Sequence, residues 1–265
     1  MIVIKIGGAA GIDPGPLCAD LAAEWRAGRR MILCHGGSDG ATTLGERLDH
    51  PPRFVVSPSG HTSRYTDRRT LEIFMMATAL LNRQLVERLA ALGVPAVGLS
   101  GIDGGLLRAR RKATIRIVED GRQRVLRDDW TGAVESVNTG LLAPLLEAGY
   151  LPVIAPLALG EAGEALNIDA DRGAAVLAGA LGAESLLLLS NVPGVLARFP
   201  DESSLIRRLP AGELDGLEAA QGRMKKKLLG AAEALRAGVG QVVIGDGRRE
   251  RPVAAALLGW GTVIA

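Results

Sequence analysis

The 265-residue chain predicts an α/β fold in which helices cover a mostly parallel sheet. Two observations favour that class. Short aliphatic runs alternate with longer stretches of helix-period hydrophobicity, and 48% of the residues are hydrophobic although only 3% are aromatic. This composition suits a large aliphatic core. A chain of this length can form one large domain or two closely joined lobes.

Six short β-branched or aliphatic runs are expected to form the strands. They are residues 2–6, 30–34, 96–99, 151–156, 185–189 and 241–244. Five segments between them carry helix-period apolar positions. They are residues 17–27, 68–91, 138–148, 171–181 and 222–237. Glycine follows each of these segments, which favours left-handed helix caps at Gly28, Gly93, Gly149, Gly182 and Gly238.

Residues 106–127 interrupt the alternation with two extended runs around Glu119-Asp120-Gly121, which predicts a hairpin. From residue 108 to residue 127, eight of twenty residues are basic, and only Glu119 and Asp120 oppose them. The eight are Arg108, Arg110, Arg111, Lys112, Arg116, Arg122, Arg124 and Arg127. Two interpretations stay open: a solvated face that discourages edge pairing, or a docking surface for an acidic macromolecule.

Charge and cysteine usage limit the classes of partner. A formal net charge of +2 is too small for the whole molecule to act as a polycation. Cys18 and Cys34 lie in apolar settings without a CxxC spacing, which favours buried thiols and fits a reducing compartment. Residues 1–6 read as a strand, and no segment approaches the length of a membrane span. We therefore expect a cytoplasmic protein without a membrane partner.

Several familiar catalytic signatures are missing. The chain contains no GxxxxGK[ST] loop and no GxGxxG that opens a helix after a strand. His35, His50 and His61 are scattered without metal-ligand spacing. These absences disfavour P-loop, dinucleotide-binding and zinc-enzyme functions. Nucleic-acid binding is also disfavoured, because only Trp130 could stack bases near the basic segment.

Two glycine pairs follow predicted strands. Lys5-Ile6-Gly7-Gly8 ends the first strand, and His35-Gly36-Gly37-Ser38 ends the second. A backbone without β-carbons approaches phosphate closely, and its N–H groups can form an anion-binding nest. Ligands of open α/β sheets bind at the carboxyl ends of the strands. Either loop alone could be a tight turn into a helix, but the pair side by side favours a phosphate site.

Two later segments carry charge at helix starts. In Asn167-Ile168-Asp169-Ala170-Asp171, alternate residues of an extended stretch face the same way, so the three polar side chains can converge. Asp171 could equally be a helix N-cap. Met224-Lys225-Lys226-Lys227 opens a late helix, where lysines oppose the macrodipole and indicate either a solvated face or a bound anion.

Six motifs together resemble the amino acid kinase family, in their order and over the whole chain. They are Lys5-x-Gly-Gly8, His35-Gly-Gly37, Gly60-x-x-x-Arg64-x-Thr66, Asn167-x-Asp-x-Asp171, Asn191-Val-Pro-Gly194 and Gly222-x-Met-x-x-Lys227. Residues 51–67, 99–104 and 110–112 are more similar to the lysine-biosynthesis branch, whose members phosphorylate aminoadipate tethered to a small acidic carrier protein, LysW. Three positions depart from the pattern of many relatives: Ser38, Asp169 and Asn191.

The resemblance implies a three-layer α/β/α sandwich with a mainly parallel sheet. It implies one domain over residues 1–265, in which about 1–178 bind the acyl substrate and about 179–265 bind ATP. The implied dimer joins the substrate lobes. It also implies that Mg²⁺ arrives with ATP, with no metal ligand from protein side chains. The alternative within the family is a kinase for N-acetylglutamate or carrier-bound glutamate in arginine biosynthesis. A noncatalytic amino-acid sensor or nucleotide-storage protein on the same fold is a further alternative.

The resemblance also implies a role for individual residues. Lys5 and Lys227 stabilise the transferred phosphoryl group, and Asp171 orients them. The implied substrate-binding residues are Gly36, Gly37, Arg64 and Asn167, and the implied nucleotide-binding residues are Gly7, Gly8, Ser190 and Asn191. With LysW as partner, the basic segment becomes the expected docking surface, through Arg108, Arg110, Arg111 and Lys112. A carboxylate acceptor is already ionised at neutral pH, so this chemistry requires no general base.

Overall fold

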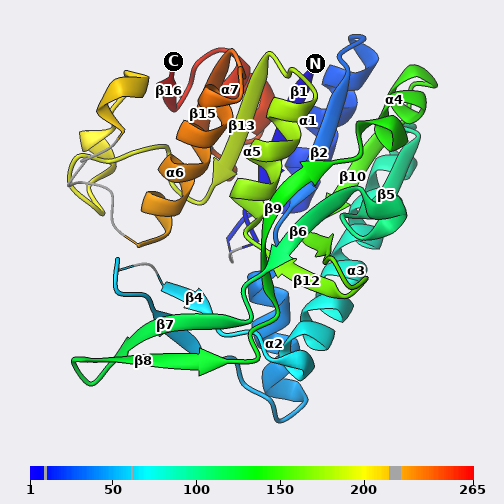
Figure 1. The fold of residues 1–265 in the computed structure, drawn as a ribbon. Coiled ribbons are helices and arrows are strands. Elements are labelled where there is room, and N and C mark those ends of the chain that lie inside the picture. The colour runs from blue at the N-terminus through cyan, green and yellow to red at the C-terminus, as the bar shows by residue number, and fades with distance from the viewer. Residues whose placement is uncertain (9–10, 61, 215–221) are drawn as a thin grey trace.

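The computed structural model describes residues 1–8, 11–60, 62–214 and 222–265. Within these residues, an eight-stranded sheet forms the middle layer, in the order β14-β16-β15-β13-β1-β2-β10-β5 (Figure 1). All neighbours are parallel except β15 and β16. The strands are β1 (Ile2–Ile6), β2 (Met31–His35), β5 (Ala96–Ser100), β10 (Leu151–Ala155), β13 (Ser185–Ser190), β14 (Arg208–Leu209), β15 (Gln241–Asp246) and β16 (Thr262–Ile264).

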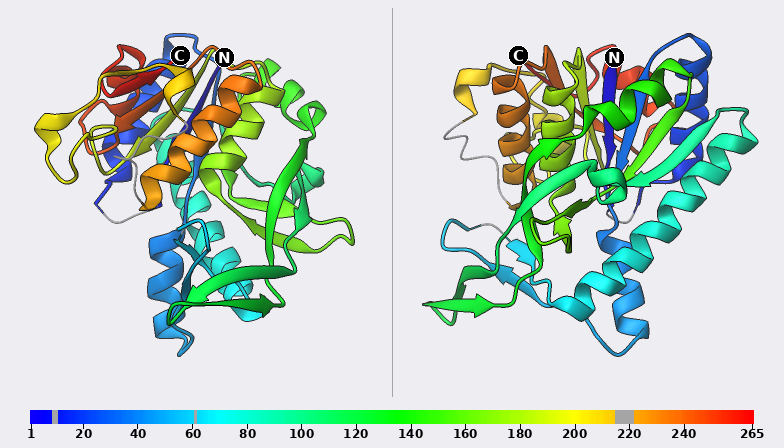
Figure 2. Two further views of the ribbon diagram at one scale, coloured as in Figure 1. Left: turned by 60° about the vertical axis from the view of Figure 1, so that its left-hand side comes forward. Right: turned by 45° about the vertical axis from the view of Figure 1, so that its right-hand side comes forward.

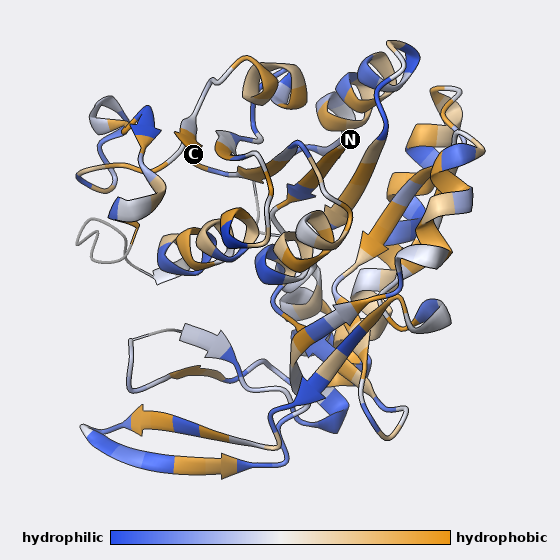
Figure 3. Ribbon diagram, turned by 45° about the horizontal axis from the view of Figure 1, so that its top comes forward, coloured by the Kyte–Doolittle hydropathy of each residue, from blue (hydrophilic) through white to orange (hydrophobic). Residues whose placement is uncertain are grey.

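Helices cover both faces of this sheet, which confirms the predicted α/β class. One face packs against α1 (Pro14–Arg26), α3 (Arg68–Ala91) and α7 (Pro252–Leu257). The other face packs against α4 (Thr139–Glu147), α5 (Ala170–Ala180) and α6 (Gly222–Arg236). The middle strands β1 and β13 are buried along their whole length, and hydrophobic colour concentrates in the sheet in Figure 3. Two aliphatic cores therefore sandwich one sheet.

Two smaller β structures lie beyond one end of the main sheet. The barrel is closed by β6 (Leu107–Arg111), β9 (Thr131–Val137), β11 (Leu157–Leu159) and β12 (Ala165–Ile168). The outer sheet is antiparallel and consists of β3 (Phe54–Val56), β4 (Thr62–Arg64), β7 (Thr114–Glu119) and β8 (Arg122–Arg127). Helix α2 (Ser38–Arg47) packs against α3. Figure 2 shows the β7–β8 hairpin projecting from the body of the molecule. Three short 3-10 turns complete the elements: η1 (Asp103–Gly105), η2 (Glu202–Ser204) and η3 (Ala211–Glu213).

All six predicted strands and five predicted helices are present, with ends within three residues of the prediction. The largest shift is at α1, which begins earlier because Asp13 caps it through the N–H of Gly15 and proline suits the first turn. The five expected helix-ending glycines all adopt positive φ, from 58° at Gly182 to 90° at Gly238. Local sequence signals therefore determine the main sandwich.

The hairpin prediction is confirmed for β7 and β8, whose turn residues Asp120 and Gly121 both have positive φ. The first extended run, however, is not continuous. It divides into β6, which pairs with β9 in the barrel, and β7, which pairs with β8 in the outer sheet. Consequently Arg108, Arg110 and Arg111 lie on β6, and Lys112 follows it. These four residues precede the β7–β8 hairpin, which we call the arm, and are not part of it.

The two glycine loops meet where β1 and β2 end. A β-carbon built on Gly8 would lie 2.3 Å from the Gly37 nitrogen, and one on Gly36 would lie 2.5 Å from the Gly8 nitrogen. Real β-carbons do not approach backbone so closely. The predicted side-by-side arrangement is thus present, and it requires glycine because one backbone crosses directly against the other.

We expect Gly8→Ala to destabilise the protein by about 2 to 3 kcal/mol, because the added methyl group must push two backbone segments apart. Gly40→Ala is a matched control in α2, where the new β-carbon would meet only the Ala77 β-carbon at 3.9 Å. Alanine also has the higher helix propensity, so the control should be neutral or slightly stabilising. Urea denaturation measures both; equal stability of the two variants would contradict the close crossing.

Candidate active site

A cavity of about 1090 Å³ opens at the carboxyl ends of β1, β2 and β13. One wall comes from the outer sheet, including Phe54 and Arg116, and the opposite wall comes from α6, including Lys226 and Leu229. Most of the predicted site residues line it. They are Lys5, Gly7, Gly8, Gly36, Gly37, Arg64, Lys112, Asn167, Asp171, Ser190, Asn191 and Lys227. Arg108, Arg110 and Arg111 do not line this cavity.

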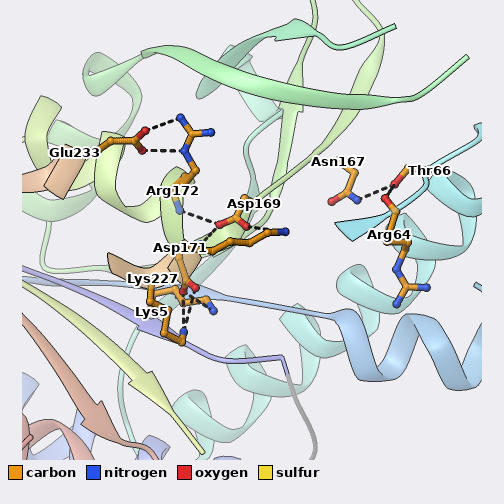
Figure 4. A network of polar contacts seen from close by, with 10 residues as sticks. Lys5, Arg64, Thr66, Asn167, Asp169, Asp171, Arg172, Lys227 and Glu233 are labelled. Carbon is orange, nitrogen blue, oxygen red and sulfur yellow. Dashed lines mark hydrogen bonds and ion pairs between the residues drawn. The ribbon is translucent and has the colours of Figure 1, made fainter. Parts of the chain in front are cut away.

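Two lysines share one carboxylate on the cavity wall. The Nζ of Lys5 lies 2.8 Å from Oδ1 of Asp171, and the Nζ of Lys227 lies 3.0 Å from Oδ2 (Figure 4). Each of the three side chains belongs to a residue that is at least nine-tenths buried. The group therefore carries a net positive charge in a place where charge is poorly solvated. Such an arrangement favours binding of an anion.

The pKa values of this group follow from burial and mutual charge. Burial opposes ionisation of Asp171, but Lys227 and Lys5 outweigh it and hold the pKa of Asp171 well below its usual range. Burial lowers the pKa of Lys227, while the attraction of Asp171 raises it and the repulsion of Lys5 lowers it again. The carboxylate is therefore fully charged at neutral pH and is the counter-ion that makes two close lysines tolerable.

Three separate elements deliver these charges. Lys5 occupies the buried strand β1, and Asp171 lies in the first turn of α5. Lys227 lies near the start of α6. Asp169, and not Asp171, is the N-cap of α5, since its Oδ1 accepts the N–H groups of Asp171 and Arg172. That cap leaves the Asp171 carboxylate available for the lysines.

The expected convergence of Asn167, Asp169 and Asp171 on one point is wrong. All three line the cavity, but the helix begins at Ala170 and rotates Asp171 away from the strand pattern. Asn167 donates instead to Thr66 Oγ1 at 3.1 Å, in the neighbourhood of Arg64 (Figure 4). Only Asp171 reaches the two lysines, so the motif divides its residues between two parts of the cavity.

The loops that follow β13, β1 and β2 lie next to one another at the carboxyl ends of these strands, because the three strands are neighbours in the sheet. The N–H of Gly7 donates to Leu189 O, which joins the first glycine loop to the strand that ends at Ser190. In the part of the chain that the structure describes, no acceptor takes the N–H of Gly8 or Gly37. These donors and the lysine pair make the loops a suitable cradle for phosphate.

The side chain of His35 contacts the backbone of the second glycine loop. Its Nδ1 donates to Gly36 O at 2.7 Å, and its Nε2 accepts from Asn82 at 3.1 Å. Burial lowers its pKa to about 4, so the ring is neutral at physiological pH. His35 is fully buried and therefore shapes the backbone of the loop without facing the cavity.

Arg64 is the main cation on the opposite part of the cavity. Its Nη2 donates to Ser38 O, Ser38 Oγ and Thr42 Oγ1, and its guanidinium lies 5.0 Å from the centre of the Phe54 ring. Among the described residues, no carboxylate pairs with Arg64. Burial lowers its pKa, which indicates partial desolvation of a group suited to planar carboxylates. Ser38 thus helps to orient this arginine.

Sequence reasoning missed Asp129, a fully buried carboxylate at the edge of the cavity. It accepts hydrogen bonds from the N–H of Thr66 and from the N–H and hydroxyl of Thr131. Burial raises its pKa, although these donors and Lys112 oppose that change. No local motif marks an isolated aspartate in a loop, and its position depends on a tertiary contact between the residues that follow β4 and those that precede β9.

The basic residues that precede the arm have individual partners. Arg110 pairs with Glu135, and Arg111 pairs with Asp128 and stacks over Trp130. Lys112 instead lines the cavity, where burial and nearby Arg172 lower its pKa. The exposed arm carries Arg116, Arg122, Arg124 and Arg127. The cations therefore divide between the cavity, its rim and the projecting hairpin.

Within the described residues, no three His, Cys, Asp or Glu side chains gather as a metal site. His61 lies outside those residues. Both cysteines are buried free thiols. None of the described helices is long and apolar enough to cross a membrane.

Comparisons with known proteins identify the family of this chain. The sequence profile of the amino acid kinase family matches residues 1–246. This chain belongs to the amino acid kinase family. Two curated relatives named [LysW]-aminoadipate kinase, from Deinococcus radiodurans and Thermus thermophilus, are 58% and 51% identical. Both alignments span 100% of this chain, and they cover 91% and 100% of the relatives.

More distant relatives extend the comparison. A Saccharolobus solfataricus protein named [LysW]-aminoadipate/[LysW]-glutamate kinase is 40% identical, over 100% of this chain and 99% of that protein. A solved N-acetylglutamate synthase from Neisseria gonorrhoeae, in complex with coenzyme A and N-acetylglutamate, superimposes with a TM-score of 0.79 at 26% identity. It covers 100% of this chain and 59% of the synthase. The amino acid kinase fold thus extends over the whole of this chain.

We expect Asp171→Asn to destabilise this kinase by about 3 to 5 kcal/mol at pH 7, because two buried ammonium groups lose their counter-ion. The folded pKa of Asp171 lies below its unfolded value, so the carboxylate contributes stability above about pH 4. That contribution is lost as pH falls further, and the difference between parent and variant should shrink. Urea denaturation from pH 7 to pH 3 measures it, with exposed Asp120→Asn as control; a difference that grows on acidification would contradict the pairing.

Proposed function

We propose that this chain transfers the terminal phosphate of ATP to the side-chain carboxylate of 2-aminoadipate carried by LysW. The product is an acyl phosphate, an intermediate for lysine biosynthesis. One observation carries the proposal: a buried group of net positive charge lies beside two glycine loops that line a large cavity. The two relatives above 50% identity support the choice of acceptor.

In the proposed reaction, a carboxylate oxygen of the acceptor attacks the terminal phosphorus as the bond to the bridging oxygen of ADP breaks. The ammonium groups of Lys5 and Lys227 stabilise negative charge on the transferred group and on the leaving oxygen. Asp171 holds both ammonium groups in place and stays ionised. Because the acceptor is ionised at neutral pH, no residue has to remove a proton.

The substrates are proposed to enter from opposite parts of the cavity. Arg64 and Asn167 bind the acceptor, on the side of residues 1–178, with Gly36 and Gly37 near the junction. The nucleotide is proposed to contact Gly7 and Gly8, which follow β1, and Ser190 and Asn191, which belong to residues 179–265. Mg²⁺ suits the phosphates themselves, because it retains water ligands and needs few from the protein. It would neutralise phosphate charge that the lysines do not reach.

The acceptor's carrier is proposed to dock on the rim that carries Arg108, Arg110, Arg111 and Lys112. Lys112 lines the cavity, and the adjoining strand β6 carries Arg108, Arg110 and Arg111 on the barrel. A cationic rim steers an acidic protein and raises the association rate more than the final affinity. We place the enzyme in the cytoplasm. A homodimer across the substrate side is the proposed assembly, and the exposed apolar Met76 and Leu80 on α3 favour it.

Carrier-bound glutamate is the second candidate acceptor, because the Saccharolobus relative is named for both substrates. The two acceptors differ by one methylene group, which is worth about 1 to 3 kcal/mol in a pocket. The cavity of about 1090 Å³ is large enough that volume alone does not decide between them. Free N-acetylglutamate, which lacks a carrier, is the other candidate acceptor in the family.

An acyl-phosphate assay with ATP and Mg²⁺ tests the proposal. Carrier-bound aminoadipate, carrier-bound glutamate and free N-acetylglutamate are compared at equal concentration. We expect carrier-bound aminoadipate to have the highest kcat/KM, by about 10-fold or more over carrier-bound glutamate. Lys227→Met serves as the inactive control. Preference for free N-acetylglutamate would assign the chain to arginine biosynthesis, and no turnover with any acceptor would favour a noncatalytic sensor.

Neutralising Arg110, Arg111 and Lys112 together should raise the apparent KM for the carrier substrate about 10-fold at low salt, with kcat changed less than twofold. The reason is that steering acts on encounter and not on the chemical step. Neutralising Arg26, Arg29 and Arg30 provides a control of equal charge change around the end of α1. An unchanged KM at low ionic strength would refute docking at this rim.

A further inference from the structure

A second ion pair links the same two helices that carry Asp171 and Lys227. Arg172 on α5 donates from Nε to Glu233 Oε2 at 2.9 Å and from Nη2 to Glu233 Oε1 at 2.5 Å. Glu233 lies on α6, and Figure 4 shows the two parallel bonds. A two-bond fork between guanidinium and carboxylate fixes orientation as well as distance. This pair is therefore more directional than a single-contact surface pair.

The fork and the catalytic pair flank one close helix contact. Arg172 follows Asp171 directly, and Glu233 lies six residues after Lys227, about 9 Å further along α6. Gly230 lies between them on α6, where an added β-carbon would be 3.4 Å from Asp171 O. Any slide of α6 along α5 would therefore displace both ion pairs together.

The rest of this helix contact has little to prevent such a slide. The buried side chains that α5 and α6 contribute to the core are mostly alanine, namely Ala174, Ala175, Ala178, Ala231, Ala232 and Ala234. Small side chains allow close approach but form shallow ridges, so they resist separation more than sliding. The directional pair supplies the missing restraint on axial position.

Glu233 distinguishes this role from substrate binding. Arg172 lines the cavity, so its charge could in principle contact a substrate, whereas Glu233 does not line it. Arg172 already lowers the pKa of Lys112 beside it. Glu233 holds two of the five N–H donors of Arg172 and pairs with its charge, whereas Arg64 has no carboxylate partner among the described residues.

We propose that Arg172 and Glu233 are positioning residues of the kinase. Their fork fixes α6 against α5 and thereby holds the ammonium group of Lys227 at the transferred phosphoryl group. The inference rests on the proposed function, since it assumes that Lys227 acts on phosphate. It assigns no substrate contact to either residue.

Steady-state kinetics of Arg172→Lys and Glu233→Gln give the first test. Lysine keeps the charge but loses the fork, and glutamine keeps the shape but loses the charge. We expect kcat to fall about 10- to 100-fold in both variants, because small displacements of catalytic groups are costly. KM values for ATP and acceptor should stay within twofold. Arg29→Lys, which alters an exposed arginine that contacts Glu24, is the matched control and should leave kcat unchanged. A rise in KM confined to Arg172→Lys would overturn the proposal in favour of substrate contact.

Acylation of lysines in the resting protein, followed by mass spectrometry, gives a second readout that needs no acceptor. Lys227 is 6% exposed, so release from its position should speed its labelling several-fold in both variants relative to Lys226. The rise in Arg172→Lys reports geometry, because this variant keeps the charge. Unchanged labelling in both variants would refute the inference even if the parent enzyme turns over. Failure of turnover by the parent would refute the proposed function alone. Glu233→Asp replaces Glu233→Gln if that variant does not fold.

Discussion

Burying two ammonium groups beside a single carboxylate leaves one positive charge without a counter-ion among the described residues. The free-energy cost of such a charge is several kcal/mol, so the rest of the fold has to hold the group together against repulsion. Lys5 is fixed by a strand buried on both faces, and Asp171 by a capped helix start. In the proposed reaction, phosphate in the cavity supplies the missing negative charge. Its binding would relieve the repulsion between the lysines, and that relief would contribute to the affinity for the transferred group.

The glycine crossing follows from the same requirement. Phosphate must come within reach of Lys5, which ends a buried strand, and only a backbone without side chains leaves room for it there. Gly8 and Gly36 satisfy this requirement and also pack directly against each other. His35 then has to be neutral, because another cation beneath Gly36 would add to the uncompensated charge. Burial lowers its pKa to about 4 and keeps it so.

The main sandwich could be predicted from sequence because its signals are local. Aliphatic runs, helical periodicity and terminal glycines each act within a few residues, and they place the ends of α3 and β1 correctly. The outer sheet and the barrel could not be predicted in this way, because strands such as β3 have three residues and alternate exposed with buried positions. Their pairing depends on partners far along the chain. For the same reason, the partners of Arg110 and Arg111 were not visible in the sequence.

The motifs predicted which residues line the site and that Asp171 would meet the two lysines, but they did not predict the local geometry of residues 167–171. Spacing predicted that Asn167, Asp169 and Asp171 would act together, yet the helix that starts at Ala170 changes the periodicity and separates them. Asp169 caps α5, Asp171 pairs with Lys5 and Lys227, and Asn167 donates a hydrogen bond to Thr66. A sequence pattern identifies which residues share a cavity, whereas the rotation of a helix start decides which one meets the charge.

The arrangement also explains how one catalytic centre can serve different acceptors. In the proposed reaction the lysines and glycine loops contact phosphate and one reacting carboxylate, so this group would not distinguish what the carboxylate is attached to. Discrimination has to come from the opposite wall, where Arg64 and Lys112 lie on or beside the small β structures. Among the described residues, the outer sheet that carries Arg64 contributes no side chain to the two aliphatic cores of the sandwich. Changes there can alter the acceptor while Lys5, Asp171 and Lys227 keep their geometry, so substrate range and chemistry are separable properties of this fold.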